Sequence, residues 1–450
     1  MPDDRTAAAA SAPRRALAPV TALLLVLAAP PSVARAGDAE LGGLLDRLRM
    51  ASDASTRDAL KAKILKTRPR ARSLIKAIRE DTTFSTPKSR GVIKLDIAGI
   101  PDPVDGFIPE SYDPGRATPL LIGLHGMGGK GEQVARPAAE LCREEGWLLL
   151  CPTLREADLK SAMASAGKTG FGWGDHRDAP ALLCLRWALR HWRVDPDRVM
   201  LLGVSLGGYG TWSAGTHHWP RFAAMMPYAG GIDYRENLEA TAKLIPKSGV
   251  PKGFMGGVGA QSGEGRRRDL LQNLKTLPTF FVHGARDRIV EPYGDRLSAR
   301  ELKKLGYKHC VYREEPDWGH MPPKDEIPKL VAELLNFAKS KRRDPDPAHV
   351  VHFAPREDTD DLGIARLVDF DEGARFEMVR KGRTLTIKTE GVRAFELEFP
   401  LSRCKTHQIS INGRRGRLRA RASAEAVLES YLRRLDTSRL HAARELVRVP

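Results

Sequence analysis

The sequence predicts an α/β fold, a mostly parallel sheet with helices on both faces, and three observations support it. Short apolar runs such as "PLLIGLHG", "WLLLCPT" and "RVMLLG" recur between residues 91 and 340. Amphipathic stretches of helical length, such as "EQVARPAAELCREEG" and "APALLCLRWALRHW", separate them. This alternation is typical of parallel sheets that helices cover on both sides. Finally, 42% of the 450 residues are hydrophobic, which is enough to form sizeable cores in two or three domains.

The regions on either side of this α/β segment have different patterns. Residues 37–83 are expected to form short helices, with Ser55 and Asp58 spaced like a capping box before "ALKAKIL". The α/β domain is expected over residues 84–340, and "SKRRDPDPAH" indicates a linker over residues 341–348. Residues 349–450 predict a small β-rich domain with a core of its own, in which Asn412-Gly413 is a hairpin-turn signal. A chain that ends near Lys341 is then expected to remain active.

The first 36 residues have the pattern of a signal peptide. Arg14 and Arg15 precede the apolar stretch "ALAPVTALLLVLAA", and Ala34-Arg35-Ala36 fits the small-x-small cleavage site. We expect cleavage after Ala36 and a secreted or periplasmic protein. A disordered Ala/Pro tail or an uncleaved anchor is the alternative. Since no apolar run of about 20 residues follows, no membrane span is expected in the mature protein.

Charge and cysteine usage narrow the choice of partners. The net charge of +17 is concentrated in "KAKILKTRPRARSLIKAIR", residues 61–79, and "NGRRGRLRAR", residues 412–421. Either segment could contact an anionic polymer or surface, although a solvated helix face and a basic strand edge are the simpler interpretations. Neither matches a nucleic-acid motif, so no specific nucleic acid is expected. The five cysteines lack metal-site spacing and leave room for one disulfide at most.

The stretch "RVMLLGVSLGGYGTW", residues 198–212, places one serine among glycines directly after an apolar strand. Gly203 and Gly207 flank Ser205 in a G-x-S-x-G pattern between a strand and a helix. Glycine is needed on both sides when the turn is so tight that a side chain would clash, and such a turn holds the serine outward as a nucleophile. The alternative is a tight turn without catalytic meaning.

An acid and a histidine follow Ser205 in the order that a catalytic triad of this kind requires. The segment "PTFFVHGARDRIVEP" ends a strand in a loop with Asp287, and "VYREEPDWGHMPP" ends another with His320. A serine hydroxyl is a poor nucleophile at neutral pH, so it needs an imidazole to take its proton and a carboxylate to orient that imidazole. Glu291 and Asp317 are rival acids, but Asp287 follows its strand at the usual distance.

A third loop supplies candidate donors for an oxyanion hole. Glycines in "PLLIGLHGMGGKGEQ" allow backbone N–H groups to point at a reacting oxygen, and we assign the two donors to Met127 and Leu206. A glycine-rich turn before a helix can also bind phosphate, but no P-loop pattern is present. His125 and His283 are interpreted as structural. No cofactor and no metal are expected.

Residues 90–340 resemble the α/β-hydrolase superfamily, in particular its secreted polyhydroxybutyrate-depolymerase-like and feruloyl-esterase-like enzymes, and are also similar to prolyl-oligopeptidase-like and dienelactone-hydrolase-like hydrolases. The segments "IPESYDPGRATPLLIGLHGMGG", "VDPDRVMLLGVSLGGYGTW", "FAAMMPYAGG", "FFVHGARDRIV" and "DWGHMPP" carry the resemblance. It implies Ser205 as nucleophile, Asp287 as acid, His320 as base, and Met127 with Leu206 as oxyanion donors.

These observations predict a secreted serine hydrolase that cleaves carboxylic esters through an acyl-enzyme intermediate. Two other functions stay open from the sequence. One is a serine peptidase of prolyl-oligopeptidase-like type, which would use the same triad on peptide bonds. The other is an inert hydrolase-fold binding protein, which an intact triad disfavours.

Overall fold

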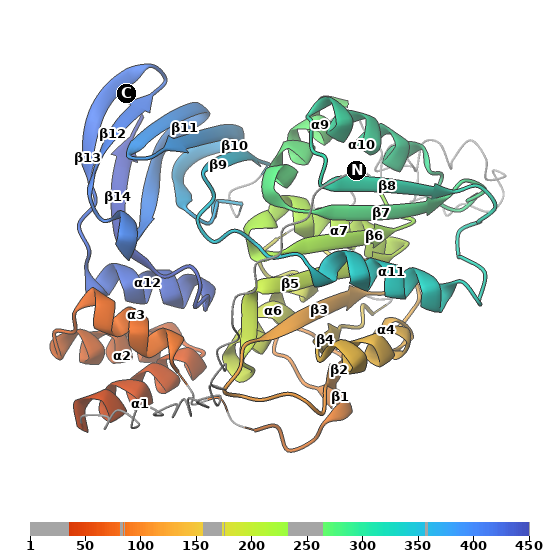
Figure 1. Ribbon diagram of the computed structural model, residues 1–450, viewed down its shortest axis with the longest axis horizontal. Coiled ribbons are helices and arrows are strands. Elements are labelled where there is room, and N and C mark those ends of the chain that lie inside the picture. The colour runs from red at the N-terminus through yellow and green to blue at the C-terminus, as the bar shows by residue number, and fades with distance from the viewer. Residues whose placement is uncertain are drawn as a thin grey trace, which may run out of the picture.

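The computed structural model describes residues 36–81, 84, 86–155, 173–174, 176–232, 264–355 and 359–449. The predicted signal peptide therefore lies outside the described residues, apart from Ala36. Figure 1 shows two sheets joined by helices, with the N-terminal helices beneath the C-terminal sheet.

The first sheet has eight strands in the order β1-β2-β4-β3-β5-β6-β7-β8. From β4 onward neighbouring strands run parallel, whereas β1 and β2 pair antiparallel at one edge and β2 runs antiparallel to β4. The predicted mostly parallel sheet is thus confirmed. Its strands are β1 (Gly91–Leu95), β2 (Val104–Ile108), β3 (Thr118–Leu124), β4 (Leu148–Cys151), β5 (Val194–Val204), β6 (Ala224–Tyr228), β7 (Thr279–Gly284) and β8 (Cys310–Glu315).

Helices cover both faces of this sheet, because successive side chains of a buried strand point to opposite sides. On β5, Met200 belongs to the hydrophobic cluster that includes side chains of α4 (Gly131–Glu145) and α11 (Ile327–Lys339). The next residue, Leu201, belongs to the cluster on the other face. The helices that contribute to this second cluster include α6 (Pro180–His191), α7 (Leu206–His217) and α10 (Tyr293–Lys304), with α9 (Glu264–Gln272) and the short turns η1 (Trp219–Arg221) and η2 (Asn273–Thr276) nearby.

The N-terminal helices are α1 (Ala36–Met50), α2 (Ala54–Lys66) and α3 (Ala71–Arg79). The predicted capping box is wrong, because Asp53 is the N-cap of α2 and its carboxylate accepts a hydrogen bond from Thr56 N. Asp53 lies two residues before Ser55, so Ser55 is already inside the helix. The sequence pattern located this helix but not the residue that caps it.

The C-terminal region forms a second sheet in the order β13-β12-β11-β10-β9, with β14 paired to β11. Asn412 and Gly413 both have positive φ, 48° and 89°, which confirms the predicted hairpin turn between β12 and β13. The elements are β9 (His349–Ala354), β10 (Ala365–Lys381), β11 (Thr384–Pro400), η3 (Leu401–Arg403), β12 (Thr406–Ile411), β13 (Arg414–Arg419), α12 (Ala424–Arg434) and β14 (His441–Arg448).

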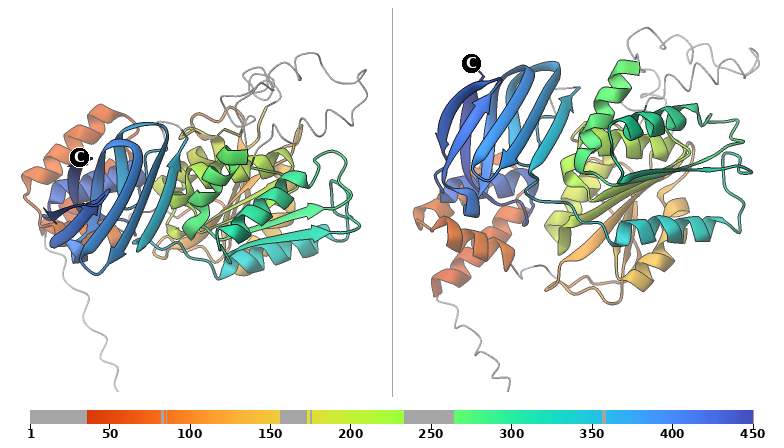
Figure 2. Two further views of the ribbon diagram at one scale, coloured as in Figure 1. Left: turned by 90° about the horizontal axis from the view of Figure 1, so that it is seen from above. Right: turned by 45° about the horizontal axis from the view of Figure 1, so that its top comes forward.

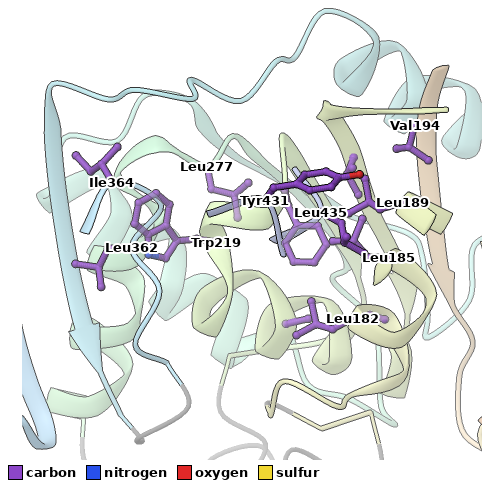
Figure 3. Close-up of a cluster of buried hydrophobic side chains, with 14 of the residues drawn as sticks. Leu182, Leu185, Leu189, Val194, Trp219, Leu277, Leu362, Ile364, Tyr431 and Leu435 are labelled. Atoms are coloured by element: carbon purple, nitrogen blue, oxygen red, sulfur yellow. The ribbon is translucent and has the colours of Figure 1, made fainter. Parts of the chain in front are cut away.

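The core of this C-terminal domain is continuous with a core of the first domain, a continuity that its sequence pattern did not indicate. One buried cluster runs from the N-terminal helices through α6 and α7 to the second sheet. Figure 3 shows part of this cluster, with Leu182, Leu185 and Leu189 of α6 and with Tyr431 and Leu435 of the α12 region. The sheet pattern identified the strands, but it could not show that α12 packs against α2 and α3, with the second sheet on its other side (Figures 1 and 2).

Buried polar contacts also join the C-terminal domain to the first. Arg343, in the predicted linker, is 6% exposed and lies 2.7 Å from carboxylate oxygens of both Asp197 and Asp436. It also donates to the Pro220 carbonyl at 2.8 Å. The side chain of Asn273 accepts from the backbone of Phe353 at 2.7 Å and donates to its carbonyl at 2.9 Å. These bonds fix the orientation of the two sheets.

Candidate active site

The turn between β5 and α7 holds Ser205 in a strained backbone conformation, with φ 56° and ψ −119°. Two close contacts explain the neighbouring glycines. A Cβ on Gly203 would lie 2.1 Å from the Gly207 carbonyl oxygen, and one on Gly207 would lie 2.0 Å from the Leu124 carbonyl oxygen. Since neither distance allows a side chain, the predicted tight turn is confirmed.

The structure brings together the three residues that the sequence placed far apart. His320 Nε2 lies 2.8 Å from Ser205 Oγ, and His320 Nδ1 lies 2.8 Å from Asp287 Oδ2. The side chain of Asp287 is fully buried, whereas that of His320 is 14% exposed. Asp287, His320 and Ser205 thus form a row of hydrogen-bonded side chains. The row leads from a buried carboxylate to a half-buried serine.

Asp287, and not Asp317, is the acid that reaches His320. Its Oδ1 accepts hydrogen bonds from the backbone N–H groups of Ile289 and Val290 at 2.8 and 2.9 Å, which leaves Oδ2 toward the histidine. Burial alone would raise the pKa of Asp287, but hydrogen bonds from His283 and His320 hold it well below its ordinary value of 3.8. Asp317 is exposed and pairs with Arg286.

The loops that carry Asp287 and His320 are bonded to each other. Arg286 N donates to the Trp318 carbonyl at 2.9 Å. Gly284 allows this approach, because a Cβ there would lie 2.2 Å from the Gly319 carbonyl oxygen. The distance between the acid and the base is therefore fixed by backbone contacts as well as by their own hydrogen bond.

The predicted oxyanion donors lie at two backbone segments beside Ser205. Leu206 is the first residue of α7, so its N–H has no acceptor within the helix. Met127 lies in the turn after β3, and Gly126 of that turn is so close that a Cβ there would lie 3.3 Å from Ser205 Cβ. The two backbone segments from which the sequence predicts the oxyanion donors therefore both lie next to Ser205.

His125 supports this turn. Its Nδ1 donates to the Gly126 carbonyl at 2.6 Å, and its Nε2 accepts from Leu154 N at 2.9 Å. Trp173 Nε1 donates to the His125 carbonyl at 3.2 Å. Burial lowers the pKa of His125, so its imidazole is neutral in this arrangement.

His283, which the sequence analysis interprets as structural only, lies directly beside the proposed acid. It contacts Asp287 directly, because its Nε2 lies 3.2 Å from Asp287 Oδ2, and its Nδ1 lies 2.7 Å from Asp295 Oδ2. The signal available in the sequence was its place directly before Gly284 at the end of a strand, four residues before Asp287. That signal could not reveal Asp295, which comes from α10.

Two further features of the described residues concern ligands and membranes. Among them, no group of three or more His, Cys, Asp or Glu side chains is arranged to hold a metal ion. Within the same part of the chain, no helix has the length and apolar character needed to cross a membrane. The five cysteines are free thiols, and Cys142, Cys151 and Cys184 are buried.

The sheet order and the covering helices define an α/β-hydrolase domain followed by a β-rich domain. Residues 167–344, which include Ser205, Asp287 and His320, match the model of the prolyl oligopeptidase family. This part of the chain is therefore a serine hydrolase domain, of esterase or peptidase type. No curated protein matches the sequence significantly.

Several solved structures are similar to this chain at low identity. A thermostable esterase is 19% identical over 56% of this chain and 63% of its own, with a TM-score of 0.40. The acylaminoacyl peptidase of Pyrococcus horikoshii is 18% identical over 58% and 43%, with a TM-score of 0.44. Est1E from Butyrivibrio proteoclasticus is 19% identical over 56% and 100%, with a TM-score of 0.40. The chain thus spans less than two thirds of the first two proteins.

Proposed function

We propose that this protein hydrolyses carboxylic esters, with Ser205 as nucleophile, His320 as general base and Asp287 as the orienting acid. The observation that carries the proposal is the continuous row of hydrogen bonds from Ser205 Oγ through His320 to Asp287 Oδ2, both at 2.8 Å. A strained serine beside a histidine whose other nitrogen bonds a buried carboxylate is suited to acyl transfer.

In the first half of the reaction, Ser205 Oγ attacks the ester carbonyl carbon and its proton passes to His320 Nε2. The carbonyl oxygen becomes an anion, which the N–H groups of Met127 and Leu206 stabilise. His320 then gives the proton to the leaving alcohol as the C–O bond breaks. In the second half, water attacks the acyl-enzyme, His320 takes one proton from it and returns that proton to Ser205, and the carboxylic acid leaves.

A peptide bond is the second candidate substrate, and the match of residues 167–344 to the prolyl oligopeptidase family favours it. Esters are the less demanding substrates, because an alcohol leaves more readily than an amine. We expect aryl esters to be cleaved and chromogenic peptides to be cleaved at least 100-fold more slowly in kcat/KM. Measuring kcat/KM for a set of aryl esters and a set of chromogenic peptides with the same enzyme preparation checks this. Cleavage of any peptide faster than the esters would show that the protein is a peptidase.

We further propose that the chain is exported and cleaved after Ala36. The support is the order of basic, apolar and small residues in the first 36 positions. N-terminal sequencing of the protein from the extracellular and periplasmic fractions should begin at Gly37. An intact N-terminus on a cytoplasmic protein would contradict the proposal.

The edge strand β13 is the better candidate of the two basic segments for contact with an anionic polysaccharide. Arg415, Arg417 and Arg419 are exposed and alternate along the strand, so they share one face. Their register partners on β12 are neutral, namely Ser410, Gln408 and Thr406. In residues 61–79, by contrast, Lys61 already pairs with two glutamates of α12 and Lys76 pairs with Glu80.

Replacing Arg415, Arg417 and Arg419 together by glutamine is expected to weaken binding to polygalacturonate at low salt at least tenfold, because it removes three positive charges that share one exposed face. The matched control replaces exposed Lys63, Lys66 and Arg72 by glutamine and removes the same charge. Equal losses in both variants would show attraction by net charge only. Affinity that does not change between 50 and 500 mM NaCl would also contradict an electrostatic contact.

A further inference from the structure

A second histidine lies buried behind the proposed triad. His283 is the residue before the last of β7, and the side chains of His283, Asp287 and Asp295 are all fully buried. His283 Nδ1 lies 2.7 Å from Asp295 Oδ2, in the first turn of α10. His283 Nε2 lies 2.9 Å from the Val290 carbonyl oxygen and 3.2 Å from Asp287 Oδ2. The row from Ser205 thus continues through Asp287 to a second imidazole and a second carboxylate.

The partners of His283 determine its protonation. A carbonyl oxygen only accepts hydrogen bonds, so Nε2 must carry a hydrogen that it shares between Val290 and Asp287. Nδ1 faces a carboxylate, so it carries a hydrogen as well, and the ring is an imidazolium. Burial alone would lower the pKa of His283, but hydrogen bonds to Asp287 and Asp295 raise it from 6.5 to about 10. His125, whose Nε2 accepts a hydrogen bond, is the neutral counterpart in the same site.

Other charged and titratable groups surround this row from neighbouring elements. Glu314 on β8 is the register partner of His283, and Arg296 of α10 binds its carboxylate at 2.7 Å. Tyr312 donates a hydrogen bond to that carboxylate, and burial together with the charge of Asp287 raises the pKa of Tyr228 on β6. Because Arg296 neutralises Glu314, His283 supplies the positive charge that directly contacts Asp287 from inside the domain.

We infer that His283 is a positioning residue, which fixes the carboxylate of Asp287 toward His320 and keeps it ionised while His320 takes up and returns the Ser205 proton. The inference rests on the proposed function. With Oδ1 held by Ile289 and Val290, the contact from His283 prevents rotation of Asp287 and favours the carboxylate over the acid. The same positive charge lies two hydrogen bonds away from His320, with Asp287 Oδ2 between the two rings.

His283→Gln tests this role, because glutamine keeps a donor toward Asp287 and removes the charge. The labelling rate with a fluorophosphonate probe between pH 5 and 9 reports the nucleophile without a known substrate. We expect the plateau rate to fall roughly 10- to 100-fold, because Asp287 is less well oriented. We also expect the midpoint of the acid limb to rise by about 1 pH unit, because a buried positive charge beside Asp287 is removed. For a cleaved ester, kcat should fall while KM is unchanged.

His352→Gln is the matched control. His352 is also buried between two hydrogen bonds, to Trp219 and to Thr359, but it lies in the C-terminal domain. The His352→Gln variant should have lower thermal stability, but the acid limb of its labelling rate should lie at the same pH as in the wild type. If His283→Gln likewise leaves the acid limb at the wild-type pH, the inference is overturned. If Ser205→Ala still labels, the proposed function fails instead, so the two failures are distinguishable.

Asp295→Asn provides a second test if His283→Gln does not fold. The asparagine oxygen can still accept from Nδ1, but His283 loses a counter-charge and should release its proton at lower pH. In the wild type, the proton on His283 stabilises the fold fully below pH 6.5, and this contribution is lost as the pH rises toward about 10. The thermal midpoint of Asp295→Asn should therefore decline at lower pH than that of the wild type. Identical pH dependence of the two proteins would contradict a charged His283.

Discussion

Ser205→Ala and His320→Ala are each expected to lower kcat by roughly 10⁴-fold or more, with KM changed only by a small factor. These side chains act on the transition state, where the serine proton moves and the carbonyl oxygen becomes charged, and contribute little to ground-state binding. The double variant should be barely worse than either single variant, because the two residues act as one unit. Steady-state kinetics on an aryl ester, with circular dichroism to verify the fold, measure this effect.

Asp287→Asn should lower kcat less than Ser205→Ala does, since His320 remains present but is badly oriented. Ser213→Ala on the same helix, α7, is the matched control and should keep wild-type kcat. Wild-type hydrolysis of an activated ester by folded Ser205→Ala would show that the turn after β5 is structural only.

Contrary to the expectation from the sequence, ending the chain after Lys341 should give an insoluble or unfolded protein, because buried contacts join the two domains. The cut removes Tyr431 and Leu435, which pack into the same cluster as Leu182, Leu185 and Leu189, and so exposes apolar surface along α6 (Figure 3). It also removes the buried cation Arg343 from Asp197. Solubility and thermal unfolding of the shortened protein, beside the protein from Gly37 onward, measure the loss. A soluble shortened protein that melts at the wild-type temperature would show two independent cores.

A point variant at the same boundary separates charge from hydrophobic packing. Arg343→Leu removes the buried cation that pairs with the carboxylates of both Asp197 and Asp436, so a loss of about 3–5 kcal/mol in the free energy of unfolding is expected. Arg342→Leu is the matched control, because Arg342 is exposed and its pair with Asp195 should contribute less than about 1 kcal/mol. Equal effects of the two variants in chemical denaturation would contradict the structural role of Arg343.

The sequence alone was sufficient for features that depend on local geometry. The alternation of apolar runs and amphipathic stretches predicted the parallel sheet and its two covered faces. The glycines around Ser205 predicted a turn too tight for side chains, and Asn412-Gly413 predicted the β12–β13 hairpin. In each case the residues that form the pattern lie a few positions apart, so the pattern itself carries the information, even where the clash that requires it comes from a neighbouring strand, as for Gly207 and Leu124.

Features that depend on partners far along the chain were decided only by the tertiary structure. The contact of Asp287 with His320 needed the loops after β7 and β8 to meet at Gly284, and the sequence left Glu291 and Asp317 as rivals. The charge of His283 is set by Asp295 from α10 and by the Val290 carbonyl, neither of which a strand pattern can place. The sequence of the C-terminal strands predicted a separate domain, because alternating apolar and polar residues indicate which side chains are buried. The alternation does not indicate which segment of the chain buries them. In the folded protein, side chains of α6 and of the α12 region belong to one buried cluster, since a distant segment removes apolar surface from water as well as a neighbouring one does.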